Sequence, residues 1–195
     1  MASAFQVATD DLLLQKARKG DLEAMEALYR TYAAPVYGLA RRFCARPQDA
    51  EEVAQETFLE VFKSLGRFRG DAPLWAWVRR ITASKALMRI RQADGVREES
   101  LGHRDEGGDD VAGSDPGPSA SIESEKVALE KALARLAPLA RAVVWLHDVE
   151  GYTHDEIAEL CGKTPSFSKS QLARAHERLR SLLTRETEGL ACTQT

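Results

Sequence analysis

The chain has 195 residues, of which 44% are hydrophobic and 29% are charged. This composition is typical of a soluble globular protein and excludes a chain that is disordered throughout. No apolar run approaches the length of a membrane span, and residues 1–11 lack the basic and apolar parts of a signal peptide, so we expect a cytoplasmic protein without membrane insertion. Cys44, Cys161 and Cys192 are widely separated and odd in number, so neither a disulfide framework nor a zinc site is predicted.

The formal net charge of −3 conceals an uneven distribution along the chain. Residues 1–92 contain 15 basic and 11 acidic side chains, residues 93–121 contain 2 and 8, and residues 122–195 contain 10 and 11. Residues 93–121 are also rich in Gly, Asp, Ser and Pro, which is typical of a flexible acidic linker. Because so long a segment without structure is unusual inside a compact domain, we predict one domain at 1–92 and another at 122–185, followed by a tail at 186–195.

Apolar residues recur at helical spacing on both sides of this linker, and no alternating strand pattern competes with them. We therefore predict an all-α protein made of two small helical domains. In the first domain, Asp21 and Asp49 are suitable N-caps and Gly66 is a suitable helix end. The helices expected in the second domain cover residues 127–136, 139–149, 154–161 and 165–183.

The expected helix at 49–65 carries Asp49, Glu52, Glu56 and Glu60 on one stripe. One interpretation is a solvated face, whose first carboxylates favour the positive end of the helix dipole. However, like charges four residues apart destabilise a helix, and no basic residue of this segment accompanies them before its last turn. The alternative interpretation is a surface for a basic protein partner.

Residues 67–92 combine seven basic side chains and one acidic side chain with Phe68, Trp75 and Trp77. Basic groups attract phosphate, and aromatic rings offer stacking surfaces to unpaired bases. This combination favours binding of single-stranded or melting DNA. The alternative is that Trp75 and Trp77 are core residues, because large aromatic side chains are usually buried.

Residues 151–183 are typical of two helices joined by a tight turn. Thr153 and Glu156 have the spacing of a capping box, Gly162 supplies the turn, and Pro165 suits the first turn of the second helix.

The second helix of this pair carries polar side chains on a face that adjoins its apolar face, at Gln171, Arg174, Arg178 and Arg185. Residues 163–185 contain six basic groups and one acidic group, so positive charge is concentrated there. This pattern predicts a helix-turn-helix with a DNA recognition helix, although many helical pairs share it.

Taken together, these motifs resemble the extracytoplasmic-function (ECF) group of bacterial RNA polymerase sigma factors, over residues 12–183 apart from the linker. The second sigma domain is matched in order and spacing by GDLEAMEALYRTYAAPVYGLARRF, DAEEVAQETFLEVFKSL and FRGDAPLWAWVRRI, and the fourth by ALARLAPLARAVVWLHDVEGYTHDEIAELCG. The resemblance implies a sigma factor that binds core RNA polymerase and directs promoter-specific transcription initiation, with no catalytic chemistry of its own.

The resemblance also implies which residues make each contact. Core polymerase would be bound by Asp49, Glu52, Gln55 and Glu56. The minus-10 element of promoter DNA would be melted and read by Arg67, Phe68, Trp75, Trp77, Arg80, Ser84, Lys85 and Arg89. The minus-35 element would be bound by Phe167, Ser168, Lys169, Gln171, Arg174 and Arg178. An anti-sigma factor is a further expected partner, and no metal or cofactor is expected.

The chain departs from the family at several of these positions. Ser84 and Met88 stand where the family commonly has Asn and Asp, and Gln171 and Ala173 stand where Arg and His are frequent. The resemblance therefore does not predict the promoter sequence.

Three other functions account for parts of the sequence. A sigma-like interaction module could bind an anti-sigma factor or polymerase without opening promoters, but it would not need the basic and aromatic residues 67–91. A helix-turn-helix repressor would leave residues 49–91 without a purpose. An enzyme is disfavoured because the sequence has no phosphate-binding loop, nucleophile motif or metal-ligand pair, and its histidines are scattered, at His103, His147, His154 and His176.

Overall fold

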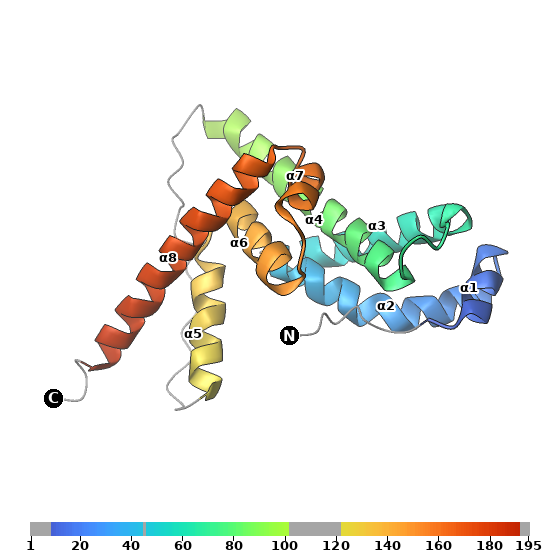
Figure 1. Cartoon of the computed structure of the whole chain (residues 1–195), viewed down its shortest axis with the longest axis horizontal. Coiled ribbons are helices and arrows are strands. Elements are labelled where there is room, and N and C mark those ends of the chain that lie inside the picture. The colour runs from blue at the N-terminus through green and yellow to red at the C-terminus, as the bar shows by residue number, and fades with distance from the viewer. Residues whose placement is uncertain (1–8, 45, 102–121, 192–195) are drawn as a thin grey trace. The chain divides into compact units, whose positions relative to one another are not determined.

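The computed structural model of the chain describes residues 9–44, 46–101 and 122–191. It divides into two compact units, Met1–Arg97 and Glu98–Thr195. All regular secondary structure in the described ranges is helical, so the prediction of an all-α protein with two helical parts is confirmed (Figure 1). None of the helices in these ranges is long and apolar enough to span a membrane.

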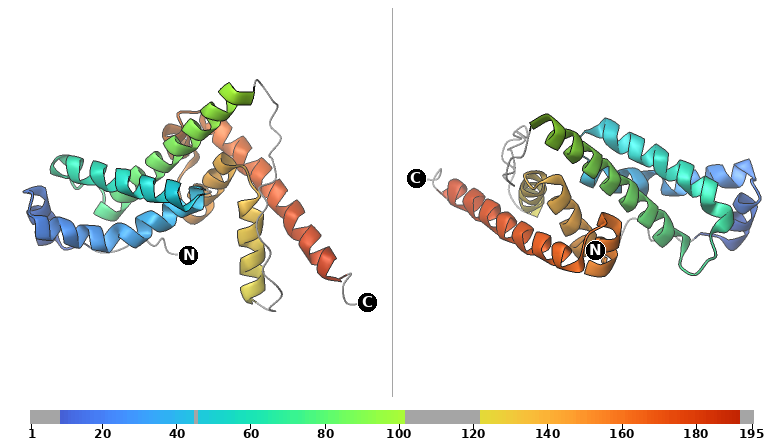
Figure 2. Two further views of the ribbon diagram at one scale, coloured as in Figure 1. Left: turned by 180° about the vertical axis from the view of Figure 1, so that it is seen from behind. Right: turned by 90° about the horizontal axis from the view of Figure 1, so that it is seen from above.

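The described part of the first unit consists of helices joined by short turns. In chain order they are α1 (Asp11–Arg18), α2 (Leu22–Phe43), α3 (Pro47–Ser64), the 3₁₀ turn η1 (Leu65–Arg67) and α4 (Leu74–Leu101). Helix α3 packs along α2 (Figure 2). The ring centroids of Tyr29 and Phe58 are 4.6 Å apart at this contact. Gly66, the predicted helix end, lies in η1. The core of the unit is formed by apolar side chains of α2, α3 and α4, among them Leu28, Tyr32, Val36, Phe43, Val53, Val61, Val78 and Leu87.

Local capping explains where two of these helices begin. Helix α2 begins as predicted after Asp21, whose carboxylate accepts a hydrogen bond of 2.9 Å from the backbone N–H of Ala24. The prediction that Asp49 caps α3 is wrong, because the N-cap is Arg46 and the first helical residue is Pro47. Proline suits that position since it has no N–H to satisfy and its φ angle is already helical.

The second unit contains a helix-turn-helix and two further helices. Its described elements are α5 (Ile122–Ala134), α6 (Pro138–Val144), the π-helical turn η2 (Trp145–Val149), α7 (His154–Cys161) and α8 (Pro165–Ala191). Helices α6 and α7 pack against α8, and α5 lies beside it (Figure 1). The core is formed by apolar side chains of all these elements, among them Ala132, Val143, Leu146, Ile157, Cys161, Leu172, Ala175 and Leu182.

Two helices extend beyond the predicted limits of the domains. Helix α4 continues to Leu101, whereas the sequence predicts a linker from residue 93, and α8 continues to Ala191, past the predicted domain end at 185. Glu and Leu follow both limits, and their favourable helix propensity outweighs the cost of Gly95 in α4 and of Gly189 in α8. The rest of the predicted linker, 102–121, and residues 192–195 of the predicted tail lie outside the described residues.

Candidate protein and nucleic-acid interfaces

The four carboxylates predicted to share one face of α3, here called the acidic stripe, differ in exposure. They are Asp49, Glu52, Glu56 and Glu60. The side chain of Asp49 is 15% exposed, whereas that of Glu52 is 53% exposed and that of Glu60 is 44% exposed. Glu56 and the neighbouring Gln55 are also exposed. Glu52, Gln55 and Glu56 therefore offer a polar surface to a partner, while Asp49 points into the unit.

Asp49 is held by two arginines. Arg46 donates hydrogen bonds from Nε to Oδ2 (2.9 Å) and from Nη2 to Oδ1 (3.0 Å), and Arg89 of α4 donates from Nη2 to Oδ1 (2.8 Å). The hydrogen bonds from Arg46 and then from Arg89 hold the pKa of Asp49 below its usual range, although burial opposes them. The geometry therefore makes Asp49 an anchor between α3 and α4.

Helix α4 supplies positive charge to the acidic stripe. Nη2 of Arg89 lies 2.6 Å from Oε2 of Glu52, and Nζ of Lys85 lies 3.9 Å from Oε2 of Glu60. The stripe therefore has compensating charge that its own segment does not supply. Lys85 and Arg89 are distant in sequence from the stripe and reach it only because α4 lies close to α3 in the folded unit.

A residue that the sequence interpretation missed is Leu59, whose side chain is 71% exposed on α3. It lies three and four residues after Glu56 and Gln55, and therefore on the same side of the helix. Its signal in the sequence is a large apolar residue on an otherwise acidic face. Apolar side chains surrounded by polar ones are typical of the centre of a protein interface.

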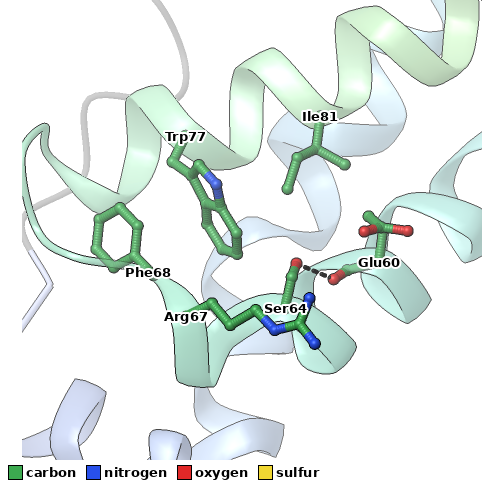
Figure 3. Close-up of a pocket in the computed structure, with 6 residues that line it drawn as sticks. All are labelled: Glu60, Ser64, Arg67, Phe68, Trp77 and Ile81. Atoms are coloured by element: carbon green, nitrogen blue, oxygen red, sulfur yellow. Dashed lines mark hydrogen bonds between the residues drawn. The ribbon is translucent and has the colours of Figure 1, made fainter.

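Phe68 and Trp77 lie together next to the start of α4. Their ring centroids are 5.0 Å apart, and both side chains are half-buried (Figure 3). Arg18 of α1 lies over the Phe68 ring, 5.4 Å from its centroid, and donates a hydrogen bond to the Phe68 carbonyl oxygen. The two rings are thus fixed by protein contacts while part of their surface stays open.

The two rings form part of the wall of an open cavity of about 270 Å³. Its lining consists of Glu60, Ser64, Arg67, Phe68, Trp77 and Ile81 (Figure 3). The volume lies just below the range of about 300–1,000 Å³ that is usual for sites of drug-sized ligands. Aromatic walls, an arginine and this small size suit a single planar base better than a large ligand.

Trp75 lies apart from this cavity. Its ring is half-buried and is covered by Arg79, whose guanidinium carbon lies 5.1 Å from the ring centroid. Neither tryptophan is therefore a fully buried core residue, and neither is fully exposed.

The other predicted minus-10 residues lie on two sides of α4. Arg80, Ser84 and Met88 follow each other at steps of four and are exposed, so they form an outward stripe. Lys85 and Arg89 face α3 through the ion pairs described above. The structure thus brings together three of the eight predicted residues at the cavity and separates the rest.

The predicted turn between α7 and α8 is confirmed. Thr153 and Glu156 form a complete capping box, in which the Thr153 N–H donates to Oε2 of Glu156 (2.8 Å). Gly162 ends α7 in the left-handed region, with φ 62° and ψ 35°. The hydroxyl of Thr164 accepts a hydrogen bond of 3.3 Å from the backbone N–H of Phe167, which caps α8.

Helix α8 carries most of the predicted minus-35 residues at its surface. The exposed ones are Lys169, Arg174 and Arg178. Gln171 and Phe167 are half-buried, and Nζ of Lys163 lies 5.8 Å from the centroid of the Phe167 ring. Ser168 is completely buried, and its hydroxyl lies 3.0 Å from Nδ1 of His154. Because a buried hydroxyl cannot reach a base, the assignment of Ser168 to DNA contact is corrected to a role in fixing α8 against α7.

The histidines are scattered along the sequence, but three of them, His147, His154 and His176, meet in the structure where η2, α7 and α8 join. The rings of His147 and His154 stack with centroids 4.6 Å apart. The carboxylate of Asp148 accepts hydrogen bonds from Nδ1 of His147 (2.8 Å) and Nε2 of His176 (2.7 Å). Within the described part of the chain, no His, Cys, Asp and Glu side chains are grouped so that they could hold a metal ion.

Two of these groups have shifted pKa values. Burial lowers the pKa of His154, and the neighbouring His147 and Lys169 lower it further, against the effect of Asp155. Burial acts to raise the pKa of Asp148, but the hydrogen bonds from the two histidines outweigh it, so this pKa is lowered.

Comparison with known proteins identifies relatives over most of the chain. Residues 28–96 match the family described as Sigma-70 region 2, and residues 126–179 match Sigma-70, region 4. The chain is 33% identical over 177 residues to the ECF RNA polymerase sigma factor SigE of Mycolicibacterium smegmatis, covering 88% of this chain and 67% of the relative. It is 31% identical over 175 residues to the ECF RNA polymerase sigma factor SigM of Mycobacterium tuberculosis, covering 90% of this chain and 85% of the relative.

Two solved structures share the fold. One is the sigma factor RpoE in complex with the anti-sigma factor NepR from Bartonella quintana, with a TM-score of 0.56, 20% identity, and coverage of 84% of this chain and 98% of that one. The other is CnrH in complex with the cytosolic domain of CnrY, with a TM-score of 0.51, 22% identity, and coverage of 89% and 96%.

Proposed function

Because the chain belongs to the ECF group of RNA polymerase sigma factors and directs promoter-specific initiation by core RNA polymerase, we propose that three separate surfaces carry out this work. Helix α3 binds polymerase, helix α4 with the Phe68 and Trp77 cavity opens and reads the minus-10 element, and helix α8 binds the minus-35 element. The observation that carries this division is the exposed charge, which is acidic on α3 and basic on α8 and at Arg80 of the outward stripe of α4.

The polymerase surface consists of Glu52, Gln55 and Glu56, with Leu59 at its apolar centre. All four side chains are exposed. Exposed carboxylates attract a basic partner before the two proteins touch. Leu59 adds burial of apolar surface once they are in contact. Asp49 supports this surface from inside the unit rather than touching the partner.

At the minus-10 element, the cavity takes up an unpaired base. Phe68 and Trp77 offer stacking surface, and Arg67 supplies positive charge at the same place. The outward stripe lets Arg80 attract phosphate while Ser84 lies within reach of a base edge or sugar. Trp75, under Arg79, is placed to support the separated strands.

At the minus-35 element, the first turns of α8 enter the major groove. Lys169, Gln171 and Arg174 then face base edges, with Gln suited to adenine and Arg to guanine. Arg178 lies one turn further on and contacts phosphate. Phe167, next to Lys163, packs at the rim of the groove.

The proposed partners are core polymerase, promoter DNA and an anti-sigma factor. The anti-sigma factor is included because the two solved structures described above are of complexes, one of them described as a sigma factor in complex with an anti-sigma factor. A protein that works on polymerase and DNA acts in the cytoplasm, and it does so without catalytic chemistry, metal or cofactor of its own.

The function is tested by run-off transcription from genomic fragments with core polymerase, with and without this protein. Discrete transcripts that depend on the protein are expected. A protein that binds polymerase but yields no such transcript from any fragment would instead be a sigma-like interaction module.

The polymerase surface is tested with the double substitution Gln55→Lys, Glu56→Lys, which introduces a positive charge at two exposed positions of α3. We expect binding to core polymerase to weaken at least tenfold in a titration, with helix content unchanged. Glu23→Lys, at an exposed position in the first turn of α2, is the matched control and should bind normally. Equal affinity of the double variant and the control would remove α3 from the interface.

A further inference from the structure

We propose that His147 and His176 form a phosphate-binding site on the second unit, which works only when their rings are protonated. Its ligand is a backbone phosphate of the minus-35 DNA, beside the bases that α8 reads. This inference rests on the proposed function, which places the first turns of α8 in the major groove. It adds a phosphate contact made partly by η2, and with it a dependence of DNA binding on protons.

Asp148 joins the two histidines, which come from different elements. Its Oδ1 accepts a hydrogen bond from Nδ1 of His147 in η2 (2.8 Å), and its Oδ2 accepts one from Nε2 of His176 in α8 (2.7 Å). The side chains are 35% exposed at His147, 36% at Asp148 and 38% at His176. A ligand in the solvent can therefore reach the cluster.

Asp148 determines which ring nitrogen carries the proton while the histidines are neutral. Burial acts to raise the pKa of Asp148, but the two histidines outweigh it and keep the carboxylate ionised. An ionised carboxylate only accepts hydrogen bonds, so the proton is on Nδ1 of His147 and on Nε2 of His176. Nε2 of His147 and Nδ1 of His176 then carry lone pairs, which cannot donate to a phosphate oxygen.

Protonation changes these two nitrogens into donors. Each ring then keeps its hydrogen bond to Asp148 and gains a charged N–H group, which makes short and strong hydrogen bonds to phosphate. Histidine is the side chain whose charge ordinarily changes between about pH 5 and 8. Phosphate binding at this site is therefore linked to the uptake of protons.

The site adjoins the face of α8 that is proposed to bind DNA. His176 follows Lys169 by seven residues, so the two side chains lie two turns apart on the same side of the helix. Lys169 is exposed and is proposed to contact base edges. The phosphates of the groove flank a recognition helix, so a cation beside that helix meets the DNA backbone.

The ring of His147 is held in place by His154, the first residue of α7. The two rings stack with centroids 4.6 Å apart and planes inclined at 21°. His154 is held in turn by Ser168, whose buried hydroxyl lies 3.0 Å from Nδ1 of His154. Burial, and then His147 and Lys169, lower the pKa of His154, which favours its neutral form beside a charged His147. His154 is therefore a positioning residue and not a ligand.

The other charged groups beside the histidines are three carboxylates and three cations, on η2, at its end and on the helices packed around it. They are Asp148, Glu150, Asp155, Arg141, Lys169 and Arg180. These groups carry no net charge together, so they give little attraction to phosphate while the histidines are neutral. Protonation of both rings adds two positive charges and makes the surroundings attractive to a DNA strand.

The first test measures binding of the holoenzyme to a fluorescent promoter duplex over a pH series at constant ionic strength. The affinity of the unmodified protein should rise about three- to tenfold from about pH 8 to 6. The double substitution His147→Gln, His176→Gln should remove most of this rise. His103→Gln, the matched control, replaces the histidine outside the cluster and should leave the rise unchanged. Circular dichroism at each pH checks that every variant is folded.

The second test replaces one titrating ring with a permanent cation. The guanidinium in His176→Arg can bond both Asp148 and a phosphate, so at about pH 8 this variant should bind at least about threefold more tightly than the unmodified protein. Its affinity should also depend less on pH. Equal or weaker binding of His176→Arg at that pH would show that the position holds no phosphate.

Three results of the pH series would overturn the proposal. The first is the same pH dependence in the unmodified protein and in the double variant. The second is a loss of affinity in the double variant that is equal at both ends of the series, which would show a role in packing alone. The third is a gain at low pH that is confined to the preferred minus-35 sequence, because a phosphate contact strengthens binding to every sequence.

Failure of the proposed function is distinguishable from failure of this inference. If α8 does not bind the minus-35 element, replacing that sequence in the duplex will leave the affinity unchanged at every pH. If the sequence does matter and the pH profiles of the unmodified protein and the double variant are parallel, only the proton-linked phosphate site is wrong.

Discussion

The indole of Trp77 packs against the ring of Phe68 with their planes inclined at 34° and their centroids 5.0 Å apart. Both side chains are half-buried, so each has one surface in the protein and another at the cavity. The sequence leaves a core role and a base-stacking role open for Trp77, and this arrangement is compatible with both. The contact with the protein holds the indole ring in position to stack on a base.

We predict that Trp77→Ala will lower both stability and promoter opening. The expected loss of stability is about 2 kcal/mol, below the range of about 3–5 kcal/mol for a fully buried aromatic, because Trp77 is only half-buried. Trp77→Phe keeps a ring against Phe68 and should recover most of the stability. Urea unfolding gives the first quantity, and permanganate reactivity of thymines in the holoenzyme–promoter complex gives the second. A folded Trp77→Ala variant that opens DNA normally would exclude the residue from melting.

Asp49 is predicted to act through stability. Asp49→Asn should destabilise the protein by about 1–3 kcal/mol at neutral pH, because two arginines lose a charged acceptor. The folded-state pKa of Asp49 is lowered, so its stabilisation is complete above its usual pKa of about 4 and is lost as the pH falls through the folded-state value. The difference in the free energy of unfolding between the unmodified protein and Asp49→Asn should therefore become smaller in acid.

The exposed Glu56 serves as the control for that experiment. Glu56→Gln should change the free energy of unfolding by less than about 0.5 kcal/mol, as is usual for surface substitutions. If Asp49→Asn and Glu56→Gln were equally harmless in urea unfolding, Asp49 would not be an anchor.

The pH dependence of the second unit is predicted to come partly from His154. Burial and the neighbouring His147 and Lys169 lower its folded-state pKa, so the unfolded chain binds a proton more readily than the folded one. Its stabilising effect is complete above the usual histidine pKa of about 6.5 and is lost as the pH falls through the folded-state value. Replacing His154 with Gln should flatten the fall in thermal stability between about pH 7 and 5. Parallel pH profiles for the two proteins would contradict this assignment.

The features that could be predicted from the sequence are those set by neighbouring residues. The capping box of Thr153 and Glu156 and the turn at Gly162 depend on residues a few positions apart, and both occur as predicted. The beginning of α3 was predicted incorrectly because Asp49 and Pro47 are both helix-start signals, and the fixed φ angle of proline prevails.

The features that could not be predicted depend on how helices dock. The ion pair of Asp49 with Arg89 joins residues 40 positions apart, and no local pattern specifies it. Ser168 and Lys169 are neighbours in sequence, but a rotation of about 100° per residue places the first in the interior and the second at the surface. Small uncertainty in the orientation of a helix is therefore enough to misplace a contact residue.

The recognition helix is predicted to use Arg174 for specificity and Arg178 for affinity. Both side chains are exposed and lie one turn apart on α8. Arg174→Ala should cost about 1–3 kcal/mol on the preferred promoter only and relax the preference at one base pair. Arg178→Ala should weaken binding to all sequences alike and reduce the salt slope by about one unit, because it removes a phosphate contact.

These two effects are separated by measuring holoenzyme binding to a set of minus-35 variants at two salt concentrations. Arg174→Ala should change the order of affinities among the minus-35 sequences without changing the salt slope much. Arg178→Ala should change the salt slope without changing that order. Lys169→Ala and Gln171→Ala extend the test to the remaining base contacts proposed for this helix. If Arg174→Ala and Arg178→Ala act equally on every sequence, α8 holds phosphate without reading bases, and specificity must then come from the minus-10 surface around Ser84.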